Sequence, residues 1–147
     1  MIVPLTEHPE FHEVVVQWLH SEWSVAASEI ETFLPPSDVR PGALVATSGD
    51  QPIGALAFKR HQSRFQSSAE LWINAVYVHP DHRGQGVGGQ LVRAAMDVCR
   101  AHGVAQVFAY TDVPGLYSTC GWQRLFLSPD SGMSTMVYET GCNPNSD

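Results

Sequence analysis

Residues 76–92 have the sequence VYVHPDHRGQGVGGQLV, in which four glycines lie between Gly84 and Gly89. Here an apolar, strand-like run passes directly into a helix-like one. Glycine is less favourable than alanine inside a helix by about 1 kcal/mol per residue. A helix that begins with so many glycines therefore indicates that a ligand has to approach its backbone closely.

The composition is typical of one globular domain. The chain has 147 residues, of which 44% are hydrophobic and 16% charged. A domain of this length can bury a hydrophobic core without a metal ion or disulfide to stabilise it. Nothing resembles a membrane span or a signal peptide, so we expect a cytoplasmic protein with no membrane partner. The three cysteines have no CxxC spacing, which predicts buried or incidental thiols and no metal site.

The net charge of −7 disfavours one class of partner and favours another. Phosphate contacts dominate nucleic-acid binding, so an acidic chain is not expected to bind nucleic acid. An acidic surface suits a cationic small molecule or a basic peptide.

Hydrophobic periodicity predicts an α+β (mixed α/β) fold in the order β-α-α-β-β-β-α-β-α-β-β. The single domain is expected over residues 1–139, with a frayed tail at 140–147 and a polar loop at 61–68. The strand–helix–strand unit of residues 69–110 predicts two adjacent parallel strands. The expected helices are 11–23, 24–34, 87–103 and a short helix or turn at 113–121; the expected strands are a hairpin within 42–60, the strands 69–78 and 104–110, and a final hairpin over 122–139.

Two familiar phosphate-binding patterns fit the glycines poorly. The string Gly84 to Gly89 satisfies GxGxxG, and Asp112 lies further on near a strand end, as in a dinucleotide-binding fold. However, His-Pro-Asp-His-Arg separates the strand from the glycines, and too little chain follows them for a doubly wound sheet. A Walker A loop fails because no Lys-Ser or Lys-Thr follows.

A third pattern extends over more residues. The strand end Val-Tyr-Val, a proline turn and then Arg-x-x-Gly-x-Gly at Arg83, Gly86 and Gly88 resemble motif A of the GNAT acetyltransferase superfamily. The later stretch LYSTCGW at 116–122 resembles the FY-x-x-x-GF segment of the same superfamily. The resemblance implies a central twisted mixed sheet of six to seven strands flanked by about four helices.

The resemblance also implies that acetyl-CoA is the co-substrate. Backbone N–H groups at a helix N-terminus lack partners within the helix and, with the helix dipole, bind a pyrophosphate. The strand end would run beside the pantetheine. The implied cofactor-binding residues are Val76, Tyr77, Val78, Arg83, Gly84, Gln85, Gly86, Val87, Gly88, Gly89 and Asp112.

Three residues are catalytic candidates. Tyr117 matches the family's tyrosine that protonates the leaving thiolate, and its alternative is a packed core tyrosine with a satisfied hydroxyl. Asn74 stands where some members carry a catalytic histidine, and could position a water. Glu70 is the nearest carboxylate and could act through that water, or it could be a solvated residue at the start of a strand. Without a bulge, Glu70, Trp72, Asn74 and Val76 would share one face of the strand.

Other polar and aromatic residues have open roles. Asp112 could contact pantetheine or a cationic acceptor, or it could simply cap the 113–121 segment. The turn from His79 to His82 is expected to lead into motif A without binding a metal. Trp18 and Trp23 are core candidates, and the family resemblance implies that one of them lines the acceptor site.

We therefore expect an acetyl-CoA-dependent N-acetyltransferase acting on a primary amine of a small molecule or peptide by direct attack in a ternary complex. The alternative is a non-catalytic acyl-CoA-binding sensor, suggested by the absence of an obvious base at Trp72 or Asn74. A homodimer is compatible with the superfamily.

Overall fold

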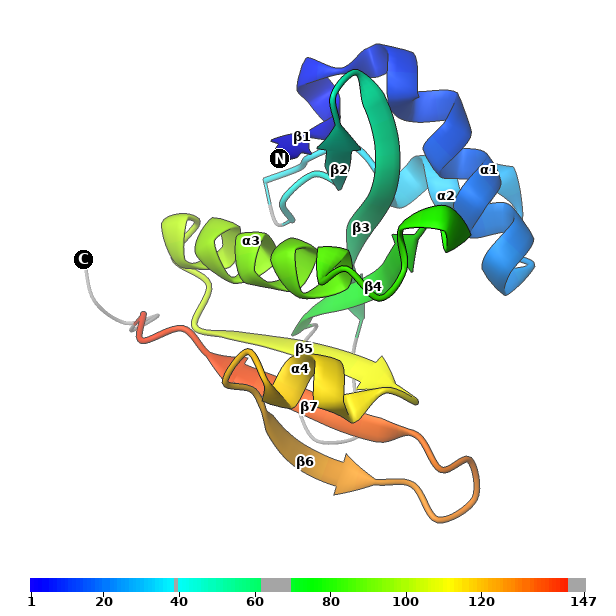
Figure 1. The fold of residues 1–147 in the computed structure, drawn as a ribbon. Coiled ribbons are helices and arrows are strands. Elements are labelled where there is room, and N and C mark those ends of the chain that lie inside the picture. Colours follow the sequence, from blue (N-terminus) through cyan, green and yellow to red (C-terminus); the bar gives the residue numbers. More distant parts are fainter. Residues whose placement is uncertain (39, 62–69, 143–147) are drawn as a thin grey trace.

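A seven-stranded mixed sheet forms the centre of the protein, with strand order β1-β2-β3-β4-β5-β7-β6 (Figure 1). The computed structural model describes residues 1–38, 40–61 and 70–142. Every neighbouring pair of strands is antiparallel except β4 and β5, which are parallel. The strands are β1 (Ile2–Pro4), β2 (Leu44–Ser48), β3 (Gln51–His61), β4 (Glu70–Val78), β5 (Gln106–Thr111), β6 (Gln123–Leu127) and β7 (Ser134–Glu139).

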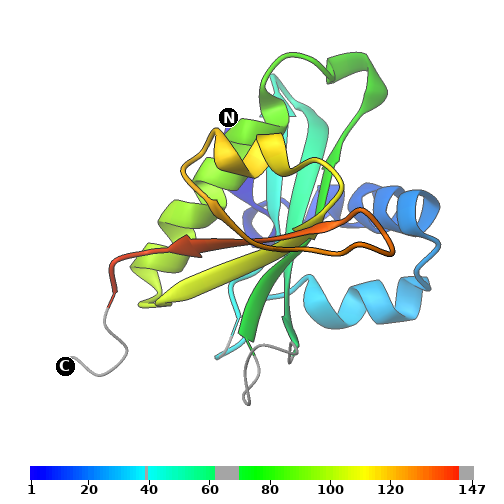
Figure 2. The same ribbon diagram turned by 90° about the horizontal axis from the view of Figure 1, so that it is seen from below.

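Helices cover both faces of this sheet (Figure 2). The helices α1 (His12–Trp23) and α2 (Ala27–Phe33) pack on one face, where they share a core cluster with β2, β3 and β4. The helices α3 (Val87–Ala101) and α4 (Pro114–Ser118) contribute to a larger cluster on the other face. Three short 3-10 helices complete the fold: η1 (Leu5–Glu7), η2 (Pro9–Phe11) and η3 (Pro80–His82).

The α3 helix shows how the pattern of apolar residues determines packing. Its buried side chains recur at helical spacing and lie on one stripe that faces the sheet: Val87, Leu91, Val92, Ala95, Met96 and Cys99. Beneath the start of the helix, Gly54 of β3 leaves room for this contact. A Cβ there would lie 2.7 Å from the carbonyl oxygen of Tyr77, so only glycine lets β3 and β4 approach so closely.

The predicted fold class and the parallel strand–helix–strand unit are confirmed. Helix α3 connects β4 to β5, which pair in parallel as expected. The second helix begins at Ala27 and not at Ser24, because Ser24 adopts the left-handed conformation (φ 55°) and ends α1. His61, expected in a loop, belongs to β3; residues 62–69 and 143–147 lie outside the described part of the chain. No described helix is long and apolar enough to cross a membrane.

The expected alternation along β4 is wrong, because the strand contains a bulge. Ala57 of β3 pairs with Ala75, but the next residue, Phe58, pairs with Ile73, so Asn74 has no partner in the ladder. A bulge shifts the face of every later side chain. Ile73 and Val76 consequently pack in the cluster under α3 and not on opposite faces.

Candidate active site

The turn that enters α3 presents a row of free backbone N–H groups. Gly84 and Gly86 have positive φ angles of 77° and 81°, and a Cβ on either would meet nothing within 4 Å. Among the described residues, the N–H groups of residues 84–89 donate no hydrogen bond. No side chain caps the helix at Gly86. The turn is thus an open concave surface of donors at the positive end of the helix dipole, which suits a phosphate group.

Neighbouring side chains hold this turn in place. The guanidinium Nε of Arg83 donates to the carbonyl oxygen of Val78 at 2.8 Å and lies over the ring of Tyr77. Nδ1 of His79 accepts from the backbone N–H of Asp81 at 3.1 Å and caps η3. The histidine turn therefore has a structural role in leading β4 into the glycines.

Beside the turn, β4 and β5 separate. Their ladder contains only the pairs Trp72–Phe108 and Ile73–Ala109. Beyond Ile73 the two strands line a cavity of about 140 Å³, which we call the gap cavity. Residues from both strands line it: Asn74, Ala75 and Val76 from β4, Tyr110 and Thr111 from β5, and Asp112 directly after β5.

Tyr117 of α4 lines the gap cavity, and its surroundings are unusual for a buried tyrosine. Its side chain is 5% exposed and packs edge-on against Trp122. Burial raises the pKa of the Tyr117 phenol well above its ordinary value of 10, and the nearby Cys120 thiol adds to this effect. Within the described part of the chain the hydroxyl has no hydrogen-bond partner, contrary to the alternative of a satisfied core tyrosine. The group is a protonated donor available to a ligand.

Two exposed polar residues that line the gap cavity are Asn74 of β4 and Asp112, which follows β5. Asn74 is exposed, unlike its buried neighbours Ile73 and Ala75, because the bulge turns it out of the core. Asp112 is exposed and supplies the only carboxylate among the residues that line the cavity. The capping role considered for Asp112 is wrong, because no described side chain caps the start of α4 at Val113. The N–H of Val113 itself donates to the hydroxyl of Thr111 at 2.9 Å.

Glu70 is not brought to this site. It begins β4, about 13 Å along the strand from Asn74 at the usual rise per residue, and it does not line the gap cavity. It is also not a solvated residue, since it is only 6% exposed. Neither carboxylate oxygen has a hydrogen-bond partner among the described residues.

Sequence patterns did not single out several residues that line the gap cavity. Tyr110, Val113 and Met133 contribute apolar wall, beside Leu116 of the motif at 116–122. Trp23 is the tryptophan of α1 that lines it, whereas Trp18 stacks on Tyr77 with ring centroids 5.0 Å apart. The sequence offers one signal for the role of Trp23. This residue lies in the last turn of the predicted helix, where the apolar periodicity of that helix ends.

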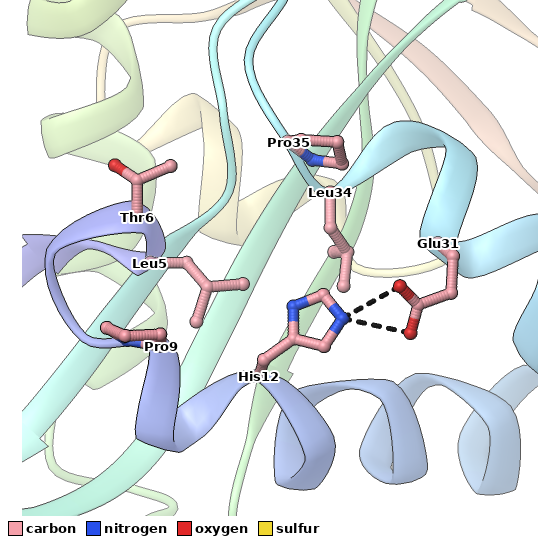
Figure 3. A pocket seen from close by; sticks show the side chains of 7 residues that line it. All are labelled: Leu5, Thr6, Pro9, His12, Glu31, Leu34 and Pro35. Carbon is pink, nitrogen blue, oxygen red and sulfur yellow. Dashed lines mark hydrogen bonds and ion pairs between the residues drawn. The ribbon is translucent and has the colours of Figure 1, made fainter.

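A second, more open hollow of about 400 Å³ lies at the other end of α1 (Figure 3). His12 points at Glu31 there, with Nε2 2.8 and 2.9 Å from the two carboxylate oxygens. The hollow lies about 16 Å along α1 from Trp23, at 1.5 Å per residue. It contains neither the free N–H groups nor Tyr117, so it is not part of the candidate active site.

A strand that leads into a glycine-rich helix start therefore lies beside a gap between two parallel strands. Residues 8–122, more than half of the chain, match the model of the acetyltransferase (GNAT) family. The protein belongs to this family of acetyltransferases, whose members use acetyl-CoA as co-substrate. Among curated proteins, none matches the chain at a significant level of sequence similarity.

Solved structures share the fold over almost the whole chain. One is the NatC complex bound to a Gag peptide and CoA, with a TM-score of 0.73, 18% identity and coverage of 95% of this chain and 97% of that one. Another is the aminoglycoside 6′-N-acetyltransferase from Enterococcus faecium, with a TM-score of 0.73, 15% identity and coverage of 100% and 99%. A third is yncA from Salmonella typhimurium with acetyl-CoA, with a TM-score of 0.68, 19% identity and coverage of 100% and 97%.

Proposed function

We propose that this protein is an acetyl-CoA-dependent N-acetyltransferase that transfers the acetyl group directly to a primary amine in a ternary complex. The observation that supports the proposal is that two structural features lie side by side. The N–H groups of residues 84–89 and the hydroxyl of Tyr117 have no hydrogen-bond partner in the described part of the chain. The turn lies next to the gap that Tyr117 lines, since Gly88 is close to Leu116 of the same lining. Aminoglycoside acetyltransferases and the peptide-bound NatC complex, which share the fold, support an amine acceptor.

The residues present fit a CoA pyrophosphate and pantetheine. The N–H groups of Gly84, Gln85, Gly86, Val87, Gly88 and Gly89 would hold the pyrophosphate, and the open space at Gly84 and Gly86 leaves room for it. The edge of β4 from Asn74 to Val78 has no ladder partner on the β5 side. An extended pantetheine can bind such an edge as an added strand does. Arg83 contributes by bracing the turn through Val78.

The gap cavity supplies the groups for acyl transfer. Acetyl-CoA provides an activated thioester. The neutral amine forms a bond to the carbonyl carbon, the carbon–sulfur bond breaks, and the nitrogen releases its extra proton to solvent as the amide forms. Tyr117 donates its phenolic proton to the departing sulfur and regains one from solvent. Its raised pKa keeps this proton on the phenol at neutral pH.

The acceptor amine must lose a proton before or during attack, because an alkylammonium has no lone pair. Asp112 is the only carboxylate that lines the cavity, so we assign it as the proton acceptor, directly or through a water that Asn74 positions. Asn74 itself cannot act as a base. Glu70 lies too far along β4 for this role.

Acyl transfer is tested by measuring CoA thiol release from acetyl-CoA with a panel of amines and peptides, together with calorimetric titration of CoA. The proposal expects saturable CoA binding and amine-dependent thiol release. If neither acetyl-CoA nor CoA binds at high micromolar concentration, the proposed function is wrong.

One observation favours a second candidate, a non-catalytic acyl-CoA sensor. Among the described residues that line the gap cavity there is no histidine, and the exposed Asp112 is the only carboxylate. A sensor would bind CoA with the same turn but release no thiol with any amine. Tyr117→Phe would then change nothing measurable, whereas an enzyme would lose rate and keep CoA affinity.

A further inference from the structure

A smaller hollow continues the gap cavity toward the helices of the other half of the molecule. This side pocket has a volume of about 130 Å³. It shares Trp23, Asn74 and Ala75 with the gap cavity, so the two spaces adjoin at the bulge of β4. A molecule whose reacting atom lies near Asn74 would therefore have a second part within reach of the side pocket.

The side pocket is lined by uncharged and mainly apolar side chains. Besides the three shared residues, α1, α2 and the turn between them contribute Leu19, Val25, Ile30 and Phe33. Asn74 is the only polar side chain in the lining. An apolar cavity of about 150 Å³ is large enough for a benzene ring. The side pocket therefore matches one branched aliphatic or aromatic group.

The uncharged lining of the side pocket disfavours a second positive charge of the acceptor there. A buried ammonium without a carboxylate partner is strongly disfavoured, and none of the described residues that line the side pocket is acidic. An acceptor with several positive charges would have to leave the others in solvent. The lining thus selects for an apolar group next to the reacting amine, despite the acidic net charge of the whole chain.

The end of α1 positions Trp23 and Val25, two of the residues that line the side pocket. Ser24, at φ 55°, reverses the chain, and its N–H donates to the carbonyl oxygen of His20 at 2.9 Å. Nδ1 of His20 in turn lies 2.7 Å from the carbonyl oxygen of Val25. This turn leaves the Trp23 ring 44% exposed although it lines both spaces.

The mouth of the gap cavity carries exposed apolar surface that a ligand could cover. Six large hydrophobic side chains are exposed among the described residues, and three of them line this cavity: Trp23, Tyr110 and Val113. Clustered exposed apolar residues mark binding surfaces more often than isolated ones do.

Resting on the proposed acetyltransferase function, we propose that the acceptor is a primary amine with a bulky apolar substituent on its α-carbon, and that this substituent occupies the side pocket. An N-terminal leucine or phenylalanine of a peptide and a free amino-acid amide share this chemistry. Trp23 and Val25 are the residues that determine the specificity.

The test compares thiol release by the full-length protein with leucinamide, glycinamide, lysinamide and a hexapeptide that begins with leucine. Burial of a leucine side chain predicts kcat/KM about ten- to hundredfold higher for leucinamide than for glycinamide. Lysinamide should fall below leucinamide. A further gain for the hexapeptide would assign a peptide acceptor, and an equal value a small amine; both outcomes support the proposal.

Two variants test whether the side pocket causes the preference for leucinamide. Val25→Phe narrows the side pocket and should bring the ratio of kcat/KM for leucinamide to that for glycinamide close to one, with unchanged CoA affinity. Trp23→Ala removes a side chain that lines the pocket and should lower the same ratio. Leu125→Ala, at an exposed residue of β6, is the matched control and should keep the wild-type ratio. Equal rates for glycinamide and leucinamide, or a preference for lysinamide, would overturn this inference and leave the proposed function intact. Absence of CoA binding would overturn both.

Discussion

Ile73 of β4 and Ala109 of β5 form the last pair of the parallel ladder between the two strands. Immediately after Ile73, the bulge at Asn74 turns β4 away, and the ladder with β5 does not resume. The gap cavity begins at this pair, with the free N–H groups of the glycine turn at the far end of β4. One local irregularity therefore opens the sheet where the proposed chemistry takes place.

Replacing Tyr117 by phenylalanine tests the proposed general acid. The change removes a hydroxyl that has no partner in the described residues, so the fold should be unaffected. We expect kcat to fall about 100-fold or more, as is typical for loss of general acid catalysis. Calorimetry should give an unchanged dissociation constant for CoA. An unaltered kcat would remove Tyr117 from the mechanism.

The glycine turn is tested with Gly86→Ala and a matched control, Gly132→Ala. Both glycines have positive φ, 81° and 74°, and open space around the position of a Cβ. Each substitution should cost about 1–2 kcal/mol of stability, because L-residues are strained in this region. Only Gly86→Ala should also weaken CoA binding, by about tenfold or more, equivalent to about 1.4 kcal/mol. Equal CoA affinity in the two variants would count against the turn as the pyrophosphate site.

Two carboxylate-to-amide substitutions separate the candidate proton acceptors. Asp112→Asn should lower kcat about tenfold or more at neutral pH, with partial recovery as rising pH deprotonates the amine in solution. Glu70→Gln is the control, since Glu70 does not line the gap cavity, and its kcat should stay within about twofold of wild type. The opposite pattern, with Glu70→Gln the slower variant, would reassign the base.

The pH dependence of stability should include a contribution from Cys99. Burial raises the pKa of this thiol from 9.0 to about 12, so the unfolded chain loses the proton first. The contribution to stability is full below pH 9 and is lost as pH rises from 9 towards 12, at no more than about 1.4 kcal/mol per pH unit. Chemical unfolding of wild type and Cys99→Ala should therefore give stabilities that converge between pH 9 and 11. Parallel curves would show that Cys99 makes no such contribution.

The sequence predicted those parts of the fold that depend on local pattern. The helix after the glycines and the strand rich in β-formers before them are visible as sequence patterns, and the glycines themselves indicate close approach of a ligand. The predicted order of elements begins with a strand, but the sequence pattern gives no bounds for it. That strand, Ile2–Pro4, has only three residues and depends on pairing with β2.

The rest of the site depends on tertiary contacts that no local pattern encodes. The bulge at Asn74 follows from how β3 and β4 pair, and it invalidated the expected faces of β4. Burial of Glu70 and the outward position of Trp23 depend likewise on segments distant in sequence. The family resemblance identified Tyr117 because its segment has a fixed order of residues, whereas the acceptor side has no such motif.

The central claim is that the backbone amides of the α3 turn bind the CoA pyrophosphate, and amide chemical-shift perturbation tests it most directly. Titration of ¹⁵N-labelled protein with CoA should shift the amide signals of residues 84–89 most strongly, and those of Asn74 to Val76 next. Shifts confined to the hollow at His12 and Glu31, or no shifts at high micromolar CoA, would contradict the claim.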